Sequence, residues 1–404
     1  MELLPHLFRK EFSKITSVIC KSFGLEHVEM AEDIASDTFL AAMETWPYNG
    51  VPANPTAWLY TVAKNKARNL MAHNDVFRRK LAPELKQQDS SHTGFEIDLS
   101  ESNIHDSQLQ MLFAVCHPSI PAEAQVGLAL RILCGFGIDE IATAFLTNRE
   151  TINKRLLRAK EKMKSENIQL RFPDTTELHG RLDSVLTTLY LLFSEGYYSE
   201  NNNEVLREDL CWEAMRLTHL LLLGKEMQQP QTYALLSLMC FHASRFKARR
   251  DKSGRMIMYD DQDEALWDME LVARGAEFLH RGSTGTHVTK YHLEASIAYW
   301  HTTKDSAGKW DNIFQLYNKL LMVQYSPVAA LNRTYALSKV KGKEVAIVDA
   351  ENLNLVDNPF YFTLLGELYD GIDRVKARTN FERALALART TADKSLIKSR
   401  LDRL

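Results

Sequence analysis

The segment from Phe136 to Lys164 has the most distinctive pattern in the sequence. This pattern indicates two short helices joined by a tight turn. Apolar residues of the second helix recur at spacings of four, three and four, which places them on one face. Those residues are Ile152, Leu156, Ala159 and Met163. Asn148 or Thr147 can cap this helix, because a short side-chain oxygen accepts from the free N–H groups of a first turn. The pattern is typical of a helix-turn-helix whose second helix enters a major groove, and also of a basic amphipathic helix pair without that role.

Helical spacing of apolar residues continues along most of the chain, and 11 Pro and 17 Gly in 404 residues leave long segments uninterrupted. We therefore expect an all-α protein of two or three domains. Because the sequence holds no run of eighteen apolar residues and no signal-peptide pattern, we expect no membrane partner. The five cysteines are far apart and form no CxxC pair. This spacing predicts reduced thiols in a cytoplasmic protein, with neither a metal site nor a cofactor.

The charge of the chain is unevenly distributed, although its net value is only −3. Residues 64–80 hold six Lys or Arg and one acid, and residues 149–164 hold seven Lys or Arg and two acids. Residues 89–106, between them, hold five acids and no Lys or Arg. Two basic segments separated by an acidic linker favour a protein that touches a phosphate backbone at two places.

The N-terminal segment, residues 1–75, indicates one compact helical unit. Its second helix, expected over residues 28–45, leaves Asp33 and Asp37 as an acidic pair outside the core. Such a pair is usually a solvated face, and a docking role for it needs support from other motifs.

A loop rich in Pro precedes the third helix, which we expect over residues 56–74 with Trp58 and Tyr60 near its start. Aromatic rings offer faces on which unstacked bases lie, and Lys and Arg hold the backbone, so this helix suits capture of a single strand. The alternative is a buried Trp that anchors the helix.

The helical pattern continues beyond about Phe172 to the end of the sequence. Pro327 and Pro359 lie 32 residues apart, and each follows a Ser or Asn that can cap a helix with Pro at its first position. Small and large residues alternate after Pro359 as in tetratricopeptide repeats. We therefore expect an α-solenoid built from helix pairs.

Acids and bases alternate near aromatic residues in this half, a pattern that suggests an enzyme; they are Glu195, Arg245, Arg249, Asp251, Asp260 and Asp263. No metal-ligand spacing, nucleophile elbow or phosphate-cradling Gly loop accompanies them. We interpret them as salt-bridged turns within the solenoid rather than as the site of an enzyme.

Three motifs in order carry a resemblance to a known family: AEDIASDTFLAAMETWP, NPTAWLYTVAKNKARN and, after the acidic linker, GIDEIATAFLTNRETINKRLLRAK. They make residues 1 to about 165 similar to an RNA polymerase sigma factor of the sigma-70 family, in the extracytoplasmic-function (ECF) group that keeps only regions 2 and 4. The C-terminal half resembles the tetratricopeptide-like (TPR-like) domain that is fused to some members.

The resemblance implies a region-2 helical bundle, a region-4 helix-turn-helix domain and a C-terminal α-solenoid. The segments are region 2 over 1–75, an acidic flexible linker over 76–106, region 4 over 107–166 and a TPR-like regulatory domain over 172–404.

The resemblance also assigns roles to individual residues. The helix that would dock on core polymerase carries Asp33, Asp37, Thr38, Phe39 and Leu40. The helix that would meet the non-template strand near the −10 element carries Trp58, Thr61, Lys64, Asn65 and Arg68. The helix that would recognise the −35 element carries Arg149, Thr151, Asn153, Lys154, Arg155, Arg158 and Lys162. Ser36 and Glu150 depart from the family, which often has Gln at the first position and Gly or Ser at the second.

The sequence therefore predicts a sigma factor that binds core RNA polymerase and promoter DNA and opens the promoter without catalysing a reaction. The first alternative is a helix-turn-helix transcription regulator with an α-solenoid sensor that does not bind polymerase. The second alternative is a scaffold or an enzyme whose function depends on the C-terminal half. The remaining expected partner is a regulatory protein or a ligand that binds the solenoid and so controls the sigma half.

Overall fold

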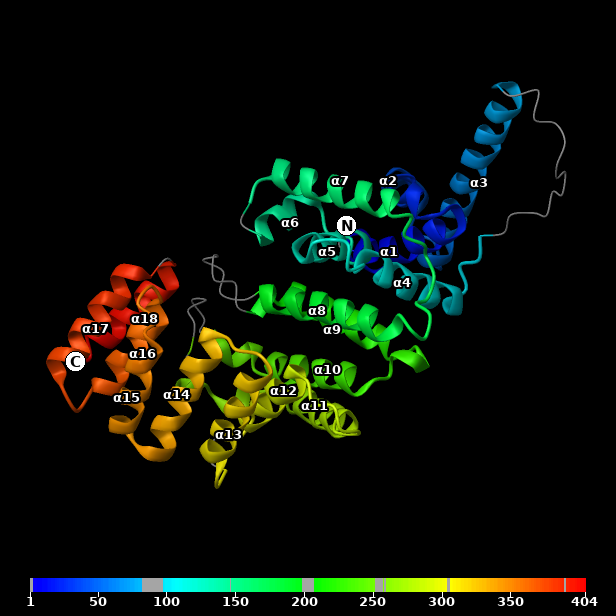
Figure 1. Cartoon of the computed structure of the whole chain (residues 1–404). Helices are drawn as coiled ribbons and strands as arrows, with labels where there is room; N and C mark the ends of the chain where they lie inside the picture. The colour runs from blue at the N-terminus through cyan, green and yellow to red at the C-terminus, as the bar shows by residue number, and fades with distance from the viewer. Residues whose placement is uncertain are drawn as a thin grey trace. The chain divides into compact units, whose positions relative to one another are not determined.

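The computed structural model of this chain describes residues 3–81, 97–145, 147–197, 207–250, 257, 259–303, 306–388 and 390–404. Every regular element in these ranges is helical and no β-strand occurs in them, which confirms the all-α prediction. The chain divides into two compact units, residues 1–191 and residues 192–404 (Figure 1). None of the described helices is both long enough and apolar enough to cross a lipid bilayer.

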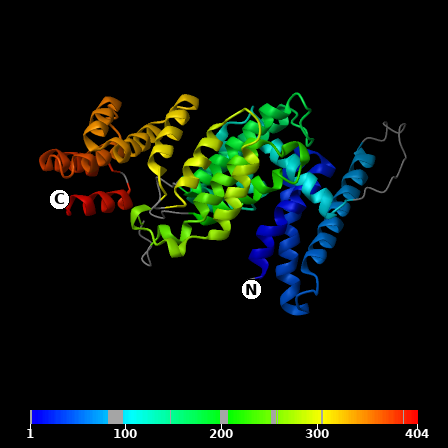
Figure 2. The same ribbon diagram turned by 90° about the horizontal axis from the view of Figure 1, so that it is seen from below.

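Unit 1 begins with three helices that lie side by side (Figure 2). They are α1 (Leu3–Phe23), α2 (Val28–Asn49) and α3 (Pro55–Leu81). Gly24 ends α1 at a φ of 98°, a conformation that glycine adopts without the steric cost of a Cβ. The loop expected from Thr45 is shorter than predicted, because α2 continues through Trp46 and Pro47. Trp46 is buried there, and its packing holds the last turns of α2 in helical form.

The second part of unit 1 contains the predicted helix pair. Its elements are α4 (Glu101–Val115), α5 (Ala122–Leu128), a π-helical turn η3 (Ala129–Leu133), α6 (Ile138–Ala144) and α7 (Arg149–Ser165). Asn148 caps α7, since its side chain accepts from the backbone N–H of Thr151 at 2.8 Å. The buried residues of α7 are the four predicted for its apolar face: Ile152, Leu156, Ala159 and Met163.

The segment before α4 differs from the expected linker. Ile97 and Leu99 are buried, and α4 begins at Glu101 instead of near Ser107. Polar residues separate these apolar side chains, so no helical period announces their burial in the sequence. Most of the remaining linker, residues 82–96, lies outside the described residues.

Helix α8 (Leu178–Tyr197) ends in unit 2, whose other helices follow one another along the chain (Figure 1). They are α9 (Glu208–Leu221), α10 (Pro230–Ala243), α11 (Met269–Gly282), α12 (Lys290–Trp300), α13 (Lys309–Val323), α14 (Pro327–Lys341), α15 (Lys343–Leu353), α16 (Pro359–Tyr369), α17 (Arg374–Leu387) and α18 (Thr391–Leu401). Each helix from α12 to α18 packs on its neighbour in sequence, which is the contact pattern of an α-solenoid.

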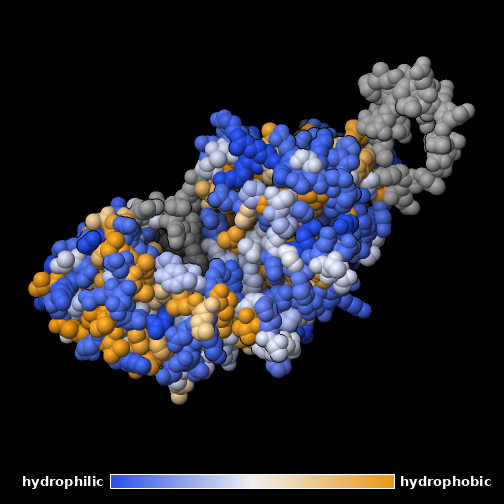
Figure 3. All heavy atoms as spheres, viewed as in Figure 1, coloured by the Kyte–Doolittle hydropathy of each residue, from blue (hydrophilic) through white to orange (hydrophobic). Residues whose placement is uncertain are grey.

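The predicted starts of two solenoid helices are confirmed. Pro327 and Pro359 occupy the first positions of α14 and α16, and the side chains of Ser326 and Asn358 cap these helices. Inside the solenoid, a Cβ on Gly366 would lie 2.8 Å from the ring of Phe381, so only glycine permits this approach of α16 and α17. Figure 3 shows apolar residues gathered on the visible surface of the last solenoid helices.

Candidate nucleic-acid and polymerase interface

The outer face of α2 combines acidic and apolar side chains. Asp33 and Asp37 are exposed, and Asp37 lies 3.6 Å from Lys66 of α3. Leu40 is 51% exposed and Met43 is 60% exposed. Apolar side chains of this size that stay in solvent beside acids suit docking on a protein surface with basic and apolar groups.

Two further residues predicted for this face have their side chains in the core. The Thr38 hydroxyl donates to the carbonyl of Ile34 at 2.7 Å, and Thr38 has no exposed surface. The ring of Phe39 packs against Phe8 at a centroid distance of 5.0 Å. In this structure these two side chains therefore position the outer face instead of forming it.

The predicted single-strand residues follow one side of α3. Thr61, Asn65 and Arg68 are exposed at helical spacing, and Lys64 beside them is partly buried. Trp58 is partly buried with its ring edge-on to Trp46 at 5.4 Å, so it both packs on α2 and reaches the surface. This side of α3 offers one ring, one amide and two cations.

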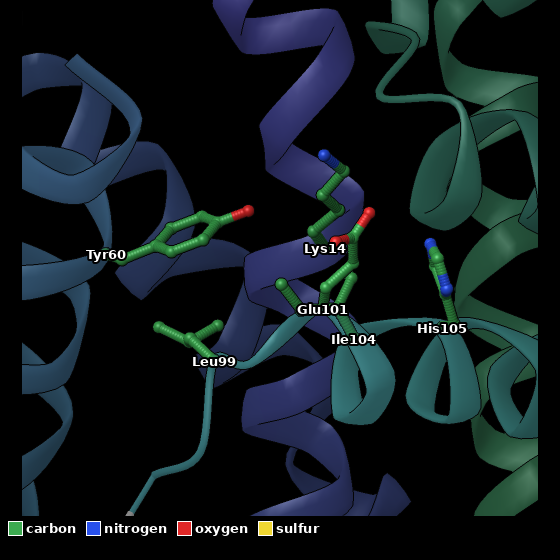
Figure 4. Close-up of a pocket in the computed structure, with 6 residues that line it drawn as sticks. All are labelled: Lys14, Tyr60, Leu99, Glu101, Ile104 and His105. Carbon is green, nitrogen blue, oxygen red and sulfur yellow. The ribbon is translucent and has the colours of Figure 1, made fainter. Parts of the chain in front are cut away.

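Tyr60 is turned away from that side and onto α1. Its hydroxyl donates to Glu11 at 2.6 Å, and burial together with this hydrogen bond raises the pKa of Tyr60. Tyr60 lines a small pocket of about 210 Å³ with Lys14, Leu99, Glu101, Ile104 and His105 (Figure 4). Tyr60 is therefore a packing residue, and Trp58 is the ring that a base can reach.

Helix α7 presents six of its seven predicted DNA contacts to solvent: Arg149, Thr151, Asn153, Lys154, Arg158 and Lys162. Some of these cations pair with nearby acids, as Lys154 does with Glu150 at 2.6 Å. Exposed pairs of this kind contribute little stability and can exchange for a phosphate. Glu150 stands where the family often has Gly or Ser. Because Lys154 partly compensates its negative charge, Glu150 repels a phosphate less than an isolated carboxylate would.

The seventh predicted contact, Arg155, is held inside the unit. Its guanidinium lies 3.0 Å from Glu123 of α5 and 5.8 Å from the ring centroid of Phe145. Its side chain is 26% exposed. Arg155 must release Glu123 before it can reach a base, whereas Arg149 and Arg158 are already exposed on α7.

Lys160 is also engaged within unit 1. Its ammonium lies 2.6 Å from Glu32 and 3.9 Å from Glu29, at the start of α2. Glu32, whose side chain is only 6% exposed, also accepts from Arg131 Nε at 2.8 Å. No local pattern in the sequence announces this pairing, because Glu32 lies 128 positions earlier in the chain than Lys160.

The cysteines of the chain lie in its core. All five cysteines are buried thiols outside any disulfide, and burial raises the pKa of Cys116 to about 12. Among the described residues, no group of three or more His, Cys, Asp or Glu side chains is arranged to hold a metal ion.

Comparison with known proteins gives two domain matches and one relative along most of the chain. Sigma-70 region 2 matches residues 8–76, and a family of unknown function (DUF6596) matches residues 181–283. An uncharacterized protein of Rhizobium meliloti (strain 1021) is 32% identical over 385 residues, which cover 94% of this chain and 90% of that protein. No solved structure matches the chain.

The region-2 match contains the outer face of α2 and the exposed side of α3, so both surfaces lie in a domain that acts in transcription initiation. The match to the Rhizobium meliloti protein extends over nearly the whole of both chains, so the two domains are parts of one type of protein. The chain therefore belongs to the family of that protein, with sigma-70 region 2 at its N-terminus followed by a domain of unknown function.

Proposed function

We propose that the protein is a sigma factor of the ECF group that binds core RNA polymerase, recognises −35 and −10 promoter elements and opens the promoter. The observation that carries the proposal is the presence, within unit 1, of three separate exposed surfaces on α2, α3 and α7. Sigma-70 region 2 supports the roles of the first two surfaces. The exposed cations and amide of α7, on a capped second helix, support recognition of a duplex by the third.

In this proposal α7 belongs to region 4, and the solenoid is a TPR-like domain that regulates the sigma half. Such a protein acts in the cytoplasm, where polymerase and DNA are, and it catalyses no reaction itself. The close approach of α16 and α17 at Gly366 is the small-against-large packing that supports a TPR-like assignment.

Binding to core polymerase tests this proposal against a regulator that acts without polymerase. The full chain is expected to form a one-to-one complex with core polymerase. The substitution Leu40→Asp is expected to abolish this complex, because it places a carboxylate in the interface where an apolar side chain made contact. Leu266→Asp is the matched control, since Leu266 is 44% exposed on unit 2 and Leu40 is 51% exposed on α2. Tight DNA binding with no polymerase complex would reject the sigma proposal and favour the regulator.

Trp58→Ala and Asn65→Ala are expected to slow promoter opening by the holoenzyme about 10-fold or more, because stacking of one base contributes roughly 1–3 kcal/mol. Binding to the closed duplex should change little, since neither residue lies on α7. Permanganate reactivity of unpaired thymines measures opening, and a band-shift at low temperature measures closed binding.

Trp58→Phe provides the control for these variants, because it keeps a ring for stacking and most of the contact with Trp46. It should retain most of the opening activity. Normal opening by both Trp58→Ala and Asn65→Ala would remove α3 from the assigned site.

A further inference from the structure

The first part of α8 is joined to the helices that precede α7 by polar contacts inside unit 1. This part, residues 178–191, lies beyond the end at residue 166 that the sequence predicts for region 4. The match to the family of unknown function begins within it, at residue 181. The first side chains of the matched domain therefore contact the segment that carries the helix pair.

Two side chains of α8 bind the C-terminal end of α4. The last carbonyls of a helix have no hydrogen-bond partner within that helix. Arg181 donates to the carbonyl of Phe113 at 2.7 Å, and the hydroxyl of Ser184 donates to the carbonyl of Cys116 at 2.7 Å. Phe113 and Cys116 are buried, so water does not replace these donors easily, and the two bonds hold α4 against α8.

Gln125 of α5 is the residue that connects α8 to the helix pair. It is 5% exposed, and its amide nitrogen donates to the carbonyls of His117 and Ile120 at 3.0 and 2.7 Å. Its amide oxygen accepts from the hydroxyl of Thr188, a buried residue of α8, at 2.6 Å. The nitrogen and the oxygen of this amide both have partners, so Gln125 fixes the first turns of α5 between the preceding loop and α8.

The opposite face of α5 contacts α7. Glu123 and Gly127 are four residues apart and share one face of α5, while Gln125 lies between them on the other face. Glu123 lies 3.0 Å from Arg155, and a Cβ on Gly127 would lie 3.2 Å from a methyl group of Leu156. Helices α5 and α7 pack directly on each other (Figure 1). The position of α5, which α8 holds, therefore sets the position of α7.

We infer that the first part of α8 belongs to the promoter-reading domain, and that Gln125 and Thr188 are positioning residues for recognition of the −35 element. Both are buried, so they act on DNA only through α5 and α7. Base edges are read by side chains held in one geometry, whereas the attraction of exposed cations to phosphates tolerates small displacements of the helix. Loss of the contact between Gln125 and Thr188 therefore lowers sequence preference more than it lowers binding to any duplex.

This inference rests on the proposed role of α7 as the reader of a duplex. It also assigns a first role to the matched domain of unknown function, because Ser184 and Thr188 lie within that match. That role is to hold the helix pair in the geometry that reads DNA.

Thr188→Val in the full chain tests the inference, because it removes the hydroxyl and leaves the amide oxygen of Gln125 with only Ser184, at 3.4 Å. The probe is a duplex that the wild type selects from a random pool, and a mixed-sequence duplex is the reference. Fluorescence anisotropy gives the affinity for each. The ratio of the two affinities is expected to fall about 10-fold in Thr188→Val. Affinity for the mixed-sequence duplex should stay within about 2-fold of the wild type.

Thr218→Val is the matched control and should keep the wild-type ratio. Thr218 is also a fully buried threonine, on α9, and its hydroxyl donates to the carbonyl four residues earlier, as that of Thr188 does. Thr188→Ser retains the hydroxyl and should retain the sequence preference. Ser184→Ala is a second variant in case Thr188→Val fails to fold, and it should lower the ratio about 3-fold.

The outcomes separate this inference from the proposed function. If the wild type selects no sequence, the proposed role of α7 is rejected, and the inference is rejected with it. If the wild type selects a duplex and Thr188→Val keeps the full ratio, the role of α8 alone is rejected. An equal loss of affinity for both duplexes, or an equal fall of the ratio in Thr218→Val, would also reject it, because the effect would then be a general loss of structure.

Discussion

Replacing Glu32 with alanine is expected to lower the free energy of unfolding of unit 1 by about 3 kcal/mol. Glu32 is nearly buried and accepts from Arg131 at 2.8 Å and from Lys160 at 2.6 Å. Alanine would leave two partly buried cations close together without their common carboxylate. The loss is larger than that of an exposed ion pair, because water cannot fully replace the missing partner.

Amide hydrogen exchange in the full chain measures this effect locally. Because Glu32 joins α2 to η3 and α7, exchange of protected amides in α2 and α7 should accelerate by roughly 100-fold, which corresponds to about 3 kcal/mol. Protection in unit 2 should stay unchanged.

Glu29→Ala is the matched control, because it removes a carboxylate one turn earlier that is exposed and 3.9 Å from Lys160. Its effect should be below about 1 kcal/mol. If both substitutions accelerated amide exchange equally, the burial of Glu32 would add nothing to the free energy of unfolding, and the prediction would be wrong.

Removing Lys154, Arg158 and Lys162 together is expected to weaken binding of the full chain to a mixed-sequence duplex by roughly 100-fold at low salt. These three side chains are exposed on α7, and a phosphate can replace the exposed acids that pair with Lys154 and Lys162. Each cation that neutralises a phosphate releases a counterion, so the slope of log K against log salt should become shallower by about 3. Fluorescence anisotropy at several salt concentrations gives both quantities.

The matched control removes three exposed cations from the end of the solenoid, Lys394, Lys398 and Arg403. This variant changes the net charge by the same amount and should leave the salt slope within error of the wild type. If both triple variants lost affinity equally, binding would follow the total charge of the chain, and α7 would not be the DNA-binding surface.

Local features of unit 1 could be predicted because they depend on residues close together in sequence. The apolar face of α7 follows from its spacing, and the cap follows from Asn148 immediately before the helix. The same holds for Pro327 and Pro359 at the starts of α14 and α16. The three motifs with their order also identified region 2, which the match over residues 8–76 supports.

Whether an individual side chain of those helices is buried or exposed could not be predicted in the same way. Thr38 and Phe39 follow the exposed Asp37 directly, and only the position of α1 decides that Phe39 packs inward on Phe8. Tyr60 and Trp58 are two residues apart on α3, and the carboxylate of Glu11 decides that Tyr60 faces inward.

The sequence by itself determined the helical class, the helix pair and the presence of sigma-70 region 2, because periodicity, capping and short motifs involve residues close together in sequence. Only the tertiary structure decided which cations stay available to a ligand. It pairs Lys160 with Glu32 and Arg155 with Glu123. The physical reason is that burial and charge compensation depend on groups from distant parts of the chain, whose approach no local pattern records.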